Sequence, residues 1–206
     1  MTITDNLLSP GKYSRPGIPL TSIMGLVVHW TAMPGQGPNG VRQFYESDEA
    51  AQDHYGSAHY GIGIDGEIQR WITEDEVAYH VGSSIIDPVS KRIYTDLARQ
   101  LFPGFCEPTT SPNHITLGIE CCIPDATGQF SAATLDSLIS LARDILKRYE
   151  LGPARLLRHY DIVGWKQCPL WYVTHPDDWI ALKQKIFEGT TQSPSAVENE
   201  RTGGEL

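Results

Sequence analysis

The strongest pattern in this sequence is an amphipathic helix over residues 131–151. Ser131 can cap its first turn by accepting a backbone N–H, and apolar side chains follow at helical spacing along one side. A helix that is apolar on one side must bury that side against another layer of secondary structure. The chain is therefore expected to build layers around a sheet. The apolar stripe consists of Leu135, Leu138, Ala142, Ile145, Leu146 and Tyr149.

Short apolar runs supply the strands of that sheet. Residues Gly25–Trp30 and 115–122 are the clearest, because they are rich in apolar residues and bounded by polar or Gly/Pro-rich segments. Shorter strands are expected at residues 77–80 and 154–159. Each run is too short for a helix of ordinary length, so a strand is the better interpretation.

A β-hairpin is predicted over residues 57–73. Its turn is expected at Asp65-Gly66, a pair that favours two-residue turns in which both residues have positive φ. Strands and helices otherwise alternate irregularly, which predicts an α/β fold with a mixed central β-sheet flanked by helices. Further helices are expected over residues 39–52, 94–101 and 176–187.

The chain of 206 residues is long enough for one domain with its own hydrophobic core. Residues 1–20 contain three prolines and are expected to be an extended lead-in. Residues 21–188 carry the helix and strand patterns and are expected to form the single domain. Within it, residues 82–113 lack strong periodicity, which is more typical of a functional segment than of an idle loop. Residues 189–206 hold few apolar side chains and are predicted to be a disordered tail.

Charge and hydropathy exclude several classes of partner. The chain has 16 Lys+Arg against 25 Asp+Glu, and its net charge of −9 argues against binding to nucleic acid. Its apolar runs are too short to be inserted across a membrane. No basic segment followed by an apolar one opens the sequence, so synthesis in the cytoplasm without a signal peptide is expected. Four cysteines in a chain of this length do not suggest a disulfide framework.

Two histidines and one cysteine lie where metal ligands would be held firmly. His29 and His159 stand at the ends of predicted strands, and Cys168 follows nine residues after His159. Two imidazoles and one thiolate suit a zinc ion and leave one tetrahedral position open. Spacing alone, however, favours an ordinary structural or surface role for such histidines over a ligand role.

Five motifs occur in the order VVHWTA, SAHYGIGIDG, VAYHVG, TLGIECC and RHYDIVGWKQCP. Together they resemble the N-acetylmuramoyl-L-alanine amidase family, which includes phage endolysins, bacterial autolysins and animal peptidoglycan-recognition proteins. The resemblance runs from about residue 25 to residue 179. It implies the amidase fold shared with peptidoglycan-recognition proteins.

The resemblance also implies an activity and a set of site residues. The activity is zinc-dependent hydrolysis of the amide between N-acetylmuramic acid and L-alanine of the stem peptide, and so lysis of the cell wall. By position, His29, His159 and Cys168 match the three metal ligands of the family. Glu120 matches the acidic residue used as general base, and Lys166 matches a lysine used beside the metal.

Other positions are expected near the peptidoglycan substrate or depart from the family pattern. His80, Trp30 and Thr31 match or adjoin positions near the substrate cleft. Some relatives carry a catalytic tyrosine just before the hairpin histidine, whereas this chain has Ala58 there. That departure makes Glu120 more necessary to the mechanism. Neither the route to the wall nor the oligomeric state follows from the sequence.

Elementary chemistry agrees with these roles. Zinc lowers the pKa of water and polarises a carbonyl, which an unreactive amide requires. Glu120 lies on the strand face opposite Leu117 and Ile119, so it can point away from the core and move the proton of the water. Lys166 would supply positive charge where the oxyanion develops.

Two alternatives remain open, the first from the residues and the second from the resemblance. In the first, the chain is a cysteine hydrolase with Cys168 as nucleophile and His159 or His29 as base. In the second, it is a peptidoglycan-binding module without activity. The presence of residues at all three ligand positions weighs against the second alternative.

Overall fold

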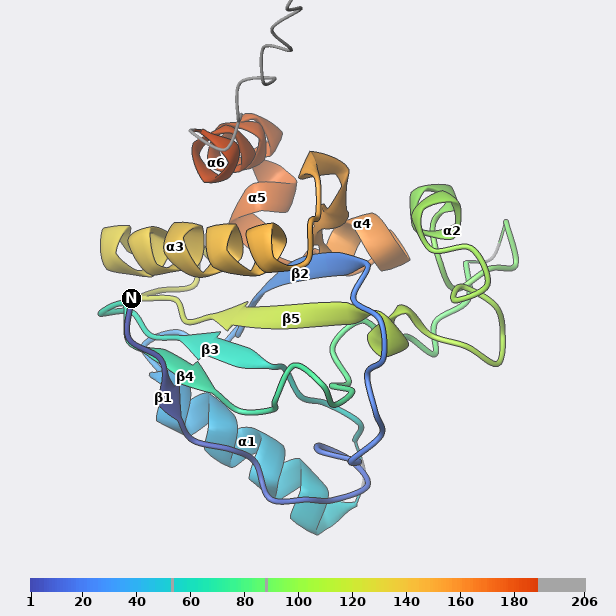
Figure 1. Cartoon of the computed structure of the whole chain (residues 1–206), viewed down its shortest axis with the longest axis horizontal. Coiled ribbons are helices and arrows are strands. Elements are labelled where there is room, and N and C mark those ends of the chain that lie inside the picture. Colours follow the sequence, from blue (N-terminus) through green and yellow to red (C-terminus); the bar gives the residue numbers. More distant parts are fainter. Residues whose placement is uncertain (53, 88, 189–206) are drawn as a thin grey trace, which may run out of the picture.

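The computed structural model describes residues 1–52, 54–87 and 89–188, and the tail predicted at 189–206 lies outside them. Among the described residues, a six-stranded sheet forms with the order β1-β4-β3-β5-β2-β6 (Figure 1). This arrangement confirms the mixed central sheet. The strands are β1 (Thr4–Asp5), β2 (Gly25–Trp30), β3 (Tyr60–Ile62), β4 (Ile68–Arg70), β5 (Thr116–Cys121) and β6 (Leu156–Arg158).

Strands β5, β2 and β6 run parallel and side by side. The register places His29 of β2 beside Glu120 of β5, and Val28 of β2 beside Arg158 of β6. The carboxyl ends of parallel strands meet at the same edge of a sheet, which is where side chains from separate segments can build a site. Strand β3 pairs parallel to β5 but antiparallel to β4, so the sheet is mixed.

Helices cover both faces of the sheet (Figure 1). Helix α3 lies on one face and α1 on the other, while α6 packs against both α3 and α5. No helix in the described part of the chain has both the length and the apolar composition needed to span a membrane. The helices are α1 (Pro38–Ala51), α2 (Asp96–Leu101), α3 (Ala132–Arg148), α4 (His159–Val163), α5 (Leu170–Thr174) and α6 (Pro176–Phe187).

The sheet separates two sets of buried side chains, because successive residues of a strand point to opposite faces. Val28 of β2 belongs to the main hydrophobic cluster together with Leu138 of α3. Val27 belongs instead to a second cluster with Phe102, which follows α2. His29 shares the face of Val27, so the sheet carries His29 on the side away from α3.

Most of the predicted elements are present. Strand β2 and helix α6 have the predicted bounds, and α1, α2, β5 and β6 differ from the expected ranges by a few residues. Helix α3 begins directly after Ser131, whose side chain accepts a hydrogen bond from the backbone N–H of Thr134. Helices α4 and α5 were not predicted, because five residues are too few to show a helical period.

The predicted type of the hairpin turn is wrong. The N–H of Gly63 donates to the carbonyl of Glu67 at 2.8 Å, so the loop contains three residues rather than two. Gly66 has φ of +86°, but Asp65 does not take positive φ and instead accepts a hydrogen bond from the N–H of Glu67 at 3.1 Å. A three-residue loop that ends on a glycine with positive φ also matches the twist of the two strands. Such a loop needs positive φ at one residue only, which here is Gly66.

The strand expected at residues 77–80 is absent. Val77 is buried, and its backbone N–H donates to the carbonyl of Ile18, outside the sheet, at 2.8 Å. The side-chain oxygen of Asn113 accepts from the N–H groups of His80 at 3.0 Å and Val81 at 2.8 Å. A single amide side chain thus satisfies backbone groups that a neighbouring strand would otherwise pair.

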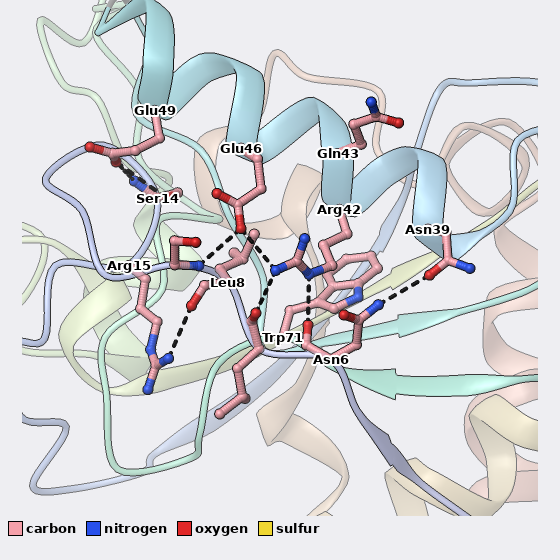
Figure 2. A network of polar contacts seen from close by, with 12 residues as sticks. Asn6, Leu8, Ser14, Arg15, Asn39, Arg42, Gln43, Glu46, Glu49 and Trp71 are labelled. Atoms are coloured by element: carbon pink, nitrogen blue, oxygen red, sulfur yellow. Dashed lines mark hydrogen bonds and ion pairs between the residues drawn. The ribbon is translucent and has the colours of Figure 1, made fainter.

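The N-terminal segment, residues 1–20, does more than lead in to the domain. It contributes strand β1, which pairs with β4 at the edge of the sheet. It is also bound along helix α1 (Figure 2), where Arg42 donates to the carbonyl of Asn6 at 2.9 Å. About two turns further along α1, Glu49 accepts a hydrogen bond from the backbone N–H of Ser14 at 2.9 Å. These long-range contacts were not visible in the local sequence pattern.

Candidate metal centre

The three candidate ligands come together at one edge of the sheet. His29 lies near the end of β2, His159 follows β6 and begins α4, and Cys168 lies between α4 and α5. Their ligand atoms all lie within 4.8 Å of one another, and Cys168 Sγ is 3.6 Å from His29 Nδ1. The exposed fractions are 1% for His29 and 2% for each of the others. The cluster is therefore buried and compact enough to hold one metal ion.

A short local structure places two of these side chains. Asp161 accepts a hydrogen bond from the backbone N–H of Arg158 at 2.8 Å, which caps the first turn of α4. The N–H of Tyr160 then donates to the carbonyl of Cys168 at 3.0 Å and draws the following loop back onto the helix. This backbone hydrogen bond therefore holds Cys168 next to the first turn of α4, which carries His159.

The hydrogen bonds of His80 determine which ring nitrogen of His29 carries the proton and which carries the lone pair. The carbonyl of Thr116 can only accept, so His80 Nε2, 3.2 Å away, carries the proton. Burial holds the pKa of both histidines well below the ordinary value, so each ring is neutral and carries one proton. His80 Nδ1 is then an acceptor, and His29 Nε2 donates to it at 3.1 Å. The lone pair of His29 is left on Nδ1, which faces Cys168.

Gly118 of β5 makes room for this arrangement. A Cβ atom added at Gly118 would lie 2.7 Å from Cγ of His80, closer than real side chains approach. The N–H of Gly118 also donates to His59 Nδ1 at 3.0 Å, and His59 Nε2 donates to the carbonyl of Glu76 at 3.0 Å. A second buried histidine therefore supports the backbone beneath His80.

His159 supplies a test of whether these residues fit a metal ion. Both of its ring nitrogens are buried, and neither has a hydrogen-bond partner among the described residues. Burial, with the nearby charge of Lys166, lowers the pKa of His159 to about 3. A neutral imidazole with an unpaired buried nitrogen is costly unless it has a ligand, and it is the form that binds metals. Together with His29 Nδ1 and Cys168 Sγ, it forms a donor set that suits zinc.

The cysteines are all reduced in the structure. Burial raises the pKa of the Cys168 thiol, and the negative charge of Glu120 adds to the effect. Such a thiol is a poor nucleophile unless a cation draws off its proton. The others, Cys106, Cys121 and Cys122, are also buried and free, so none of the four forms a disulfide.

Glu120 lies beside the cluster with its two carboxylate oxygens in different surroundings. Oε1 accepts a hydrogen bond from the hydroxyl of Tyr45 at 3.3 Å. Oε2 is buried and has no partner among the described residues. Burial raises the pKa of Glu120 to about 7, although the charge of Lys166 and the hydrogen bond from Tyr45 oppose the rise. A carboxylate with such a pKa can both take up and release a proton near neutral pH.

The remaining predicted site residues divide into two groups. Lys166 is exposed, and its charge reaches Glu120 and His159. Trp30 ends β2 and Thr31 follows it, and both are half-buried; Trp30 packs against the main hydrophobic cluster, on the face of the sheet opposite His29. His80, in contrast, is 7% exposed and lies behind His29, so its contacts are with the cluster rather than with the surface.

Sequence reasoning missed one member of the site. Tyr45 lies on α1, far along the chain from Glu120, and the residue is 8% exposed. Its only signal was a place on the buried side of a predicted helix. That position is consistent with ordinary packing, so only the fold reveals its contact with the carboxylate.

Comparisons with known proteins agree on one family. A family model described as N-acetylmuramoyl-L-alanine amidase matches residues 19–171. The chain is 29% identical over 184 residues to a probable N-acetylmuramoyl-L-alanine amidase of Bacillus licheniformis, covering 89% of this chain and 47% of that protein. It is 28% identical over 185 residues to N-acetylmuramoyl-L-alanine amidase BlyA of Bacillus subtilis (strain 168), covering 89% and 46%. The chain thus spans about half the length of these curated relatives.

Solved structures share the fold. The catalytic domain of XlyA matches with a TM-score of 0.65 at 21% identity, covering 90% of this chain and 99% of that one. The PlyG catalytic domain matches with a TM-score of 0.65 at 18% identity, covering 95% and 100%. At such identities the likeness concerns the fold alone, and it confirms the peptidoglycan-recognition-protein-like amidase fold that the motifs indicate.

Proposed function

This chain belongs to the N-acetylmuramoyl-L-alanine amidase family, and from that premise we propose that it is a zinc-dependent peptidoglycan hydrolase. The bond cleaved is the amide between N-acetylmuramic acid and L-alanine of the stem peptide. The enzyme acts on the cell wall in the manner of an endolysin or autolysin, and residues 21–188 are its catalytic domain. The observation that carries the proposal is the buried cluster of His29, His159 and Cys168.

In this proposal the zinc ligands are His29 Nδ1, a ring nitrogen of His159 and Cys168 Sγ. Two neutral imidazoles and one thiolate would leave the ion with a net positive charge and one open position. A zinc ion held there supplies Lewis acidity, which makes water a better nucleophile and the amide carbonyl a better electrophile. His80 keeps His29 in the tautomer that has its lone pair on Nδ1, so it supports the site without facing the substrate.

Glu120 is the general base. Its free oxygen, Oε2, takes a proton from the attacking water and returns it to the nitrogen of the leaving L-alanine. Burial raises the pKa of its carboxyl group, which makes it a stronger base than an exposed glutamate. Lys166 contributes positive charge that stabilises the negative charge developing on the carbonyl oxygen. Trp30 and Thr31 are proposed to contact the substrate beside His29.

The cysteine-hydrolase alternative is less well supported. The 3.6 Å separation of Cys168 Sγ and His29 Nδ1 would suit a thiol and its base. However, Cys168 is 2% exposed, and burial raises the pKa of its thiol, whereas a nucleophilic cysteine needs access and a lowered pKa. A cysteine mechanism also does not explain why both ring nitrogens of His159 are buried without a hydrogen-bond partner among the described residues.

The test is digestion of defined muropeptides followed by mass analysis. The expected products are a free lactyl carboxyl group on the muramic acid and a peptide with a new L-alanine amino terminus. Excess EDTA should abolish their formation, and added zinc should restore it. Zinc bound to a protein that releases no product would instead favour a binding module.

Two cysteine variants complete the test. Cys168→Ala should lose both bound zinc and activity, whereas Cys106→Ala, which removes another buried free thiol, should retain both. Activity that survives EDTA together with an acyl-thioester trapped on Cys168 would establish the cysteine mechanism and refute the zinc proposal.

A further inference from the structure

One contact at the site is not needed for holding a metal ion. The hydroxyl of Tyr45 donates to Glu120 Oε1 at 3.3 Å, although the two residues are far apart in the chain. The other oxygen, Oε2, stays buried without a partner among the described residues. The carboxylate is therefore anchored on one side only, and the free oxygen is the one available for proton transfer.

Such an anchor matters for a glutamate more than for a shorter side chain. Glutamate has three rotatable bonds, so an unanchored carboxylate samples several positions and loses entropy when it is fixed. A general base must lie within hydrogen-bond distance of the proton that it removes. A hydrogen bond on Oε1 reduces the rotations of the side chain and so orients Oε2.

Tyr45 is itself held from two sides. Its ring packs edge to face against Trp71, with the ring centroids 5.8 Å apart. It belongs to a buried cluster that includes Ala58 and Cys122, each 0% exposed. Trp71 is fixed in turn, because its indole N–H donates to Gln69 at 3.0 Å.

The helix that carries Tyr45 is bound along the N-terminal segment (Figure 2). Arg42 donates to the carbonyl of Leu7 at 2.6 Å, and Glu46 accepts from the backbone N–H of Ser9 at 2.9 Å. These partners flank Tyr45 on α1 by three residues and by one. The helix therefore has little freedom to slide or rotate, and the phenol on it is presented to Glu120 at a defined place.

We propose that Tyr45 is a positioning residue that orients the Glu120 carboxylate for proton transfer in the amidase reaction. The inference rests on the proposed function, in which Glu120 is the general base. Tyr45 acts only through Glu120, so removing its hydroxyl should slow the chemical step without changing how substrate or zinc binds.

The first test is Tyr45→Phe, which removes only the hydroxyl. We expect kcat for muropeptide hydrolysis to fall roughly 10- to 100-fold, as for other small misplacements of a catalytic group. KM, zinc affinity and Tm should change little. The matched control is Tyr60→Phe, because Tyr60 is 2% exposed and its hydroxyl donates to the carboxylate of Glu74 at 2.8 Å, outside the metal centre. That variant should keep kcat within about twofold.

A double-mutant cycle separates positioning from a general structural effect. Glu120→Asp keeps a carboxylate but shortens the side chain, which withdraws it from the Tyr45 hydroxyl. In that background Tyr45→Phe should have almost no further effect on kcat. An undiminished effect there, or a kcat for Tyr45→Phe within twofold of the unmodified protein, would overturn the proposal. If the unmodified protein itself released no peptide with an L-alanine terminus, the proposed function would fail instead.

Discussion

Replacement of Glu120 by glutamine should change how the stability of the metal-free protein depends on pH. The buried carboxyl group has a pKa of about 7 in the folded chain, against 4.5 for an ordinary glutamate. Between these values the folded state keeps a proton that the unfolded state releases. Stability must therefore fall as pH rises through this window, because ionisation is easier in the unfolded chain.

The magnitude follows from the two pKa values. A rise from 4.5 to about 7 corresponds to a loss of about 3 kcal/mol, at about 1.4 kcal/mol for each pKa unit. The loss is small below pH 4.5 and complete above about pH 8. Glutamine does not titrate, and its side-chain oxygen can still accept from Tyr45. The difference between the two proteins therefore isolates Glu120, since the other titrating groups are common to both.

The assay is urea unfolding of both proteins between pH 4.5 and pH 8, with EDTA present because a bound cation would itself lower the pKa of Glu120. The unmodified protein should lose about 3 kcal/mol relative to Glu120→Gln across this range. Parallel pH profiles would show that the carboxylate is solvated, and the account of Glu120 as a general base tuned by burial would then be refuted.

Three further results are expected. His80→Ala should weaken zinc binding about 10- to 100-fold, measured in competition with a chromogenic chelator, because His29 loses its hydrogen-bond acceptor. The control is His114→Ala, at an exposed histidine, which should leave zinc binding unchanged. Equal effects of the two substitutions would remove the special role of His80. Lys166→Met should lower kcat about 100-fold with little change in KM, and a change confined to KM would assign Lys166 to binding. Leu138→Ala, in the main cluster, should lower the free energy of unfolding by about 2–5 kcal/mol without altering zinc affinity in the folded protein, as followed by urea unfolding.

The layers of the fold were predictable because they depend on local periodicity. The stripe on α3 and the capping residue Ser131 are properties of consecutive residues. The structure confirms the cap and buries most of the stripe, although α3 ends at Arg148, before Tyr149. The failures occur where backbone groups find distant partners. Residues 77–80 have the composition of a strand, yet Asn113 satisfies the backbone at His80 and Val81. Nothing near that segment in the sequence indicates such a partner.

The candidate site was predictable to the level of residue type and position in the chain. His29 and His159 stand at strand ends, and parallel strands bring such ends together, so their meeting follows from the topology. Tyr45 could not be found in this way. Its distance from Glu120 depends on how α1 lies on the sheet, and that position depends on contacts with the N-terminal segment.

By itself, the sequence determined the longer strands and helices and the chemical character of the side chains at the strand ends, because short-range spacing encodes both. Only the tertiary structure decided that the lone pair of His29 lies on Nδ1, that both nitrogens of His159 lack a partner among the described residues, and that Glu120 titrates near neutral pH. These properties arise from burial and from hydrogen bonds between residues far apart in the chain, and neither is a property of any single segment.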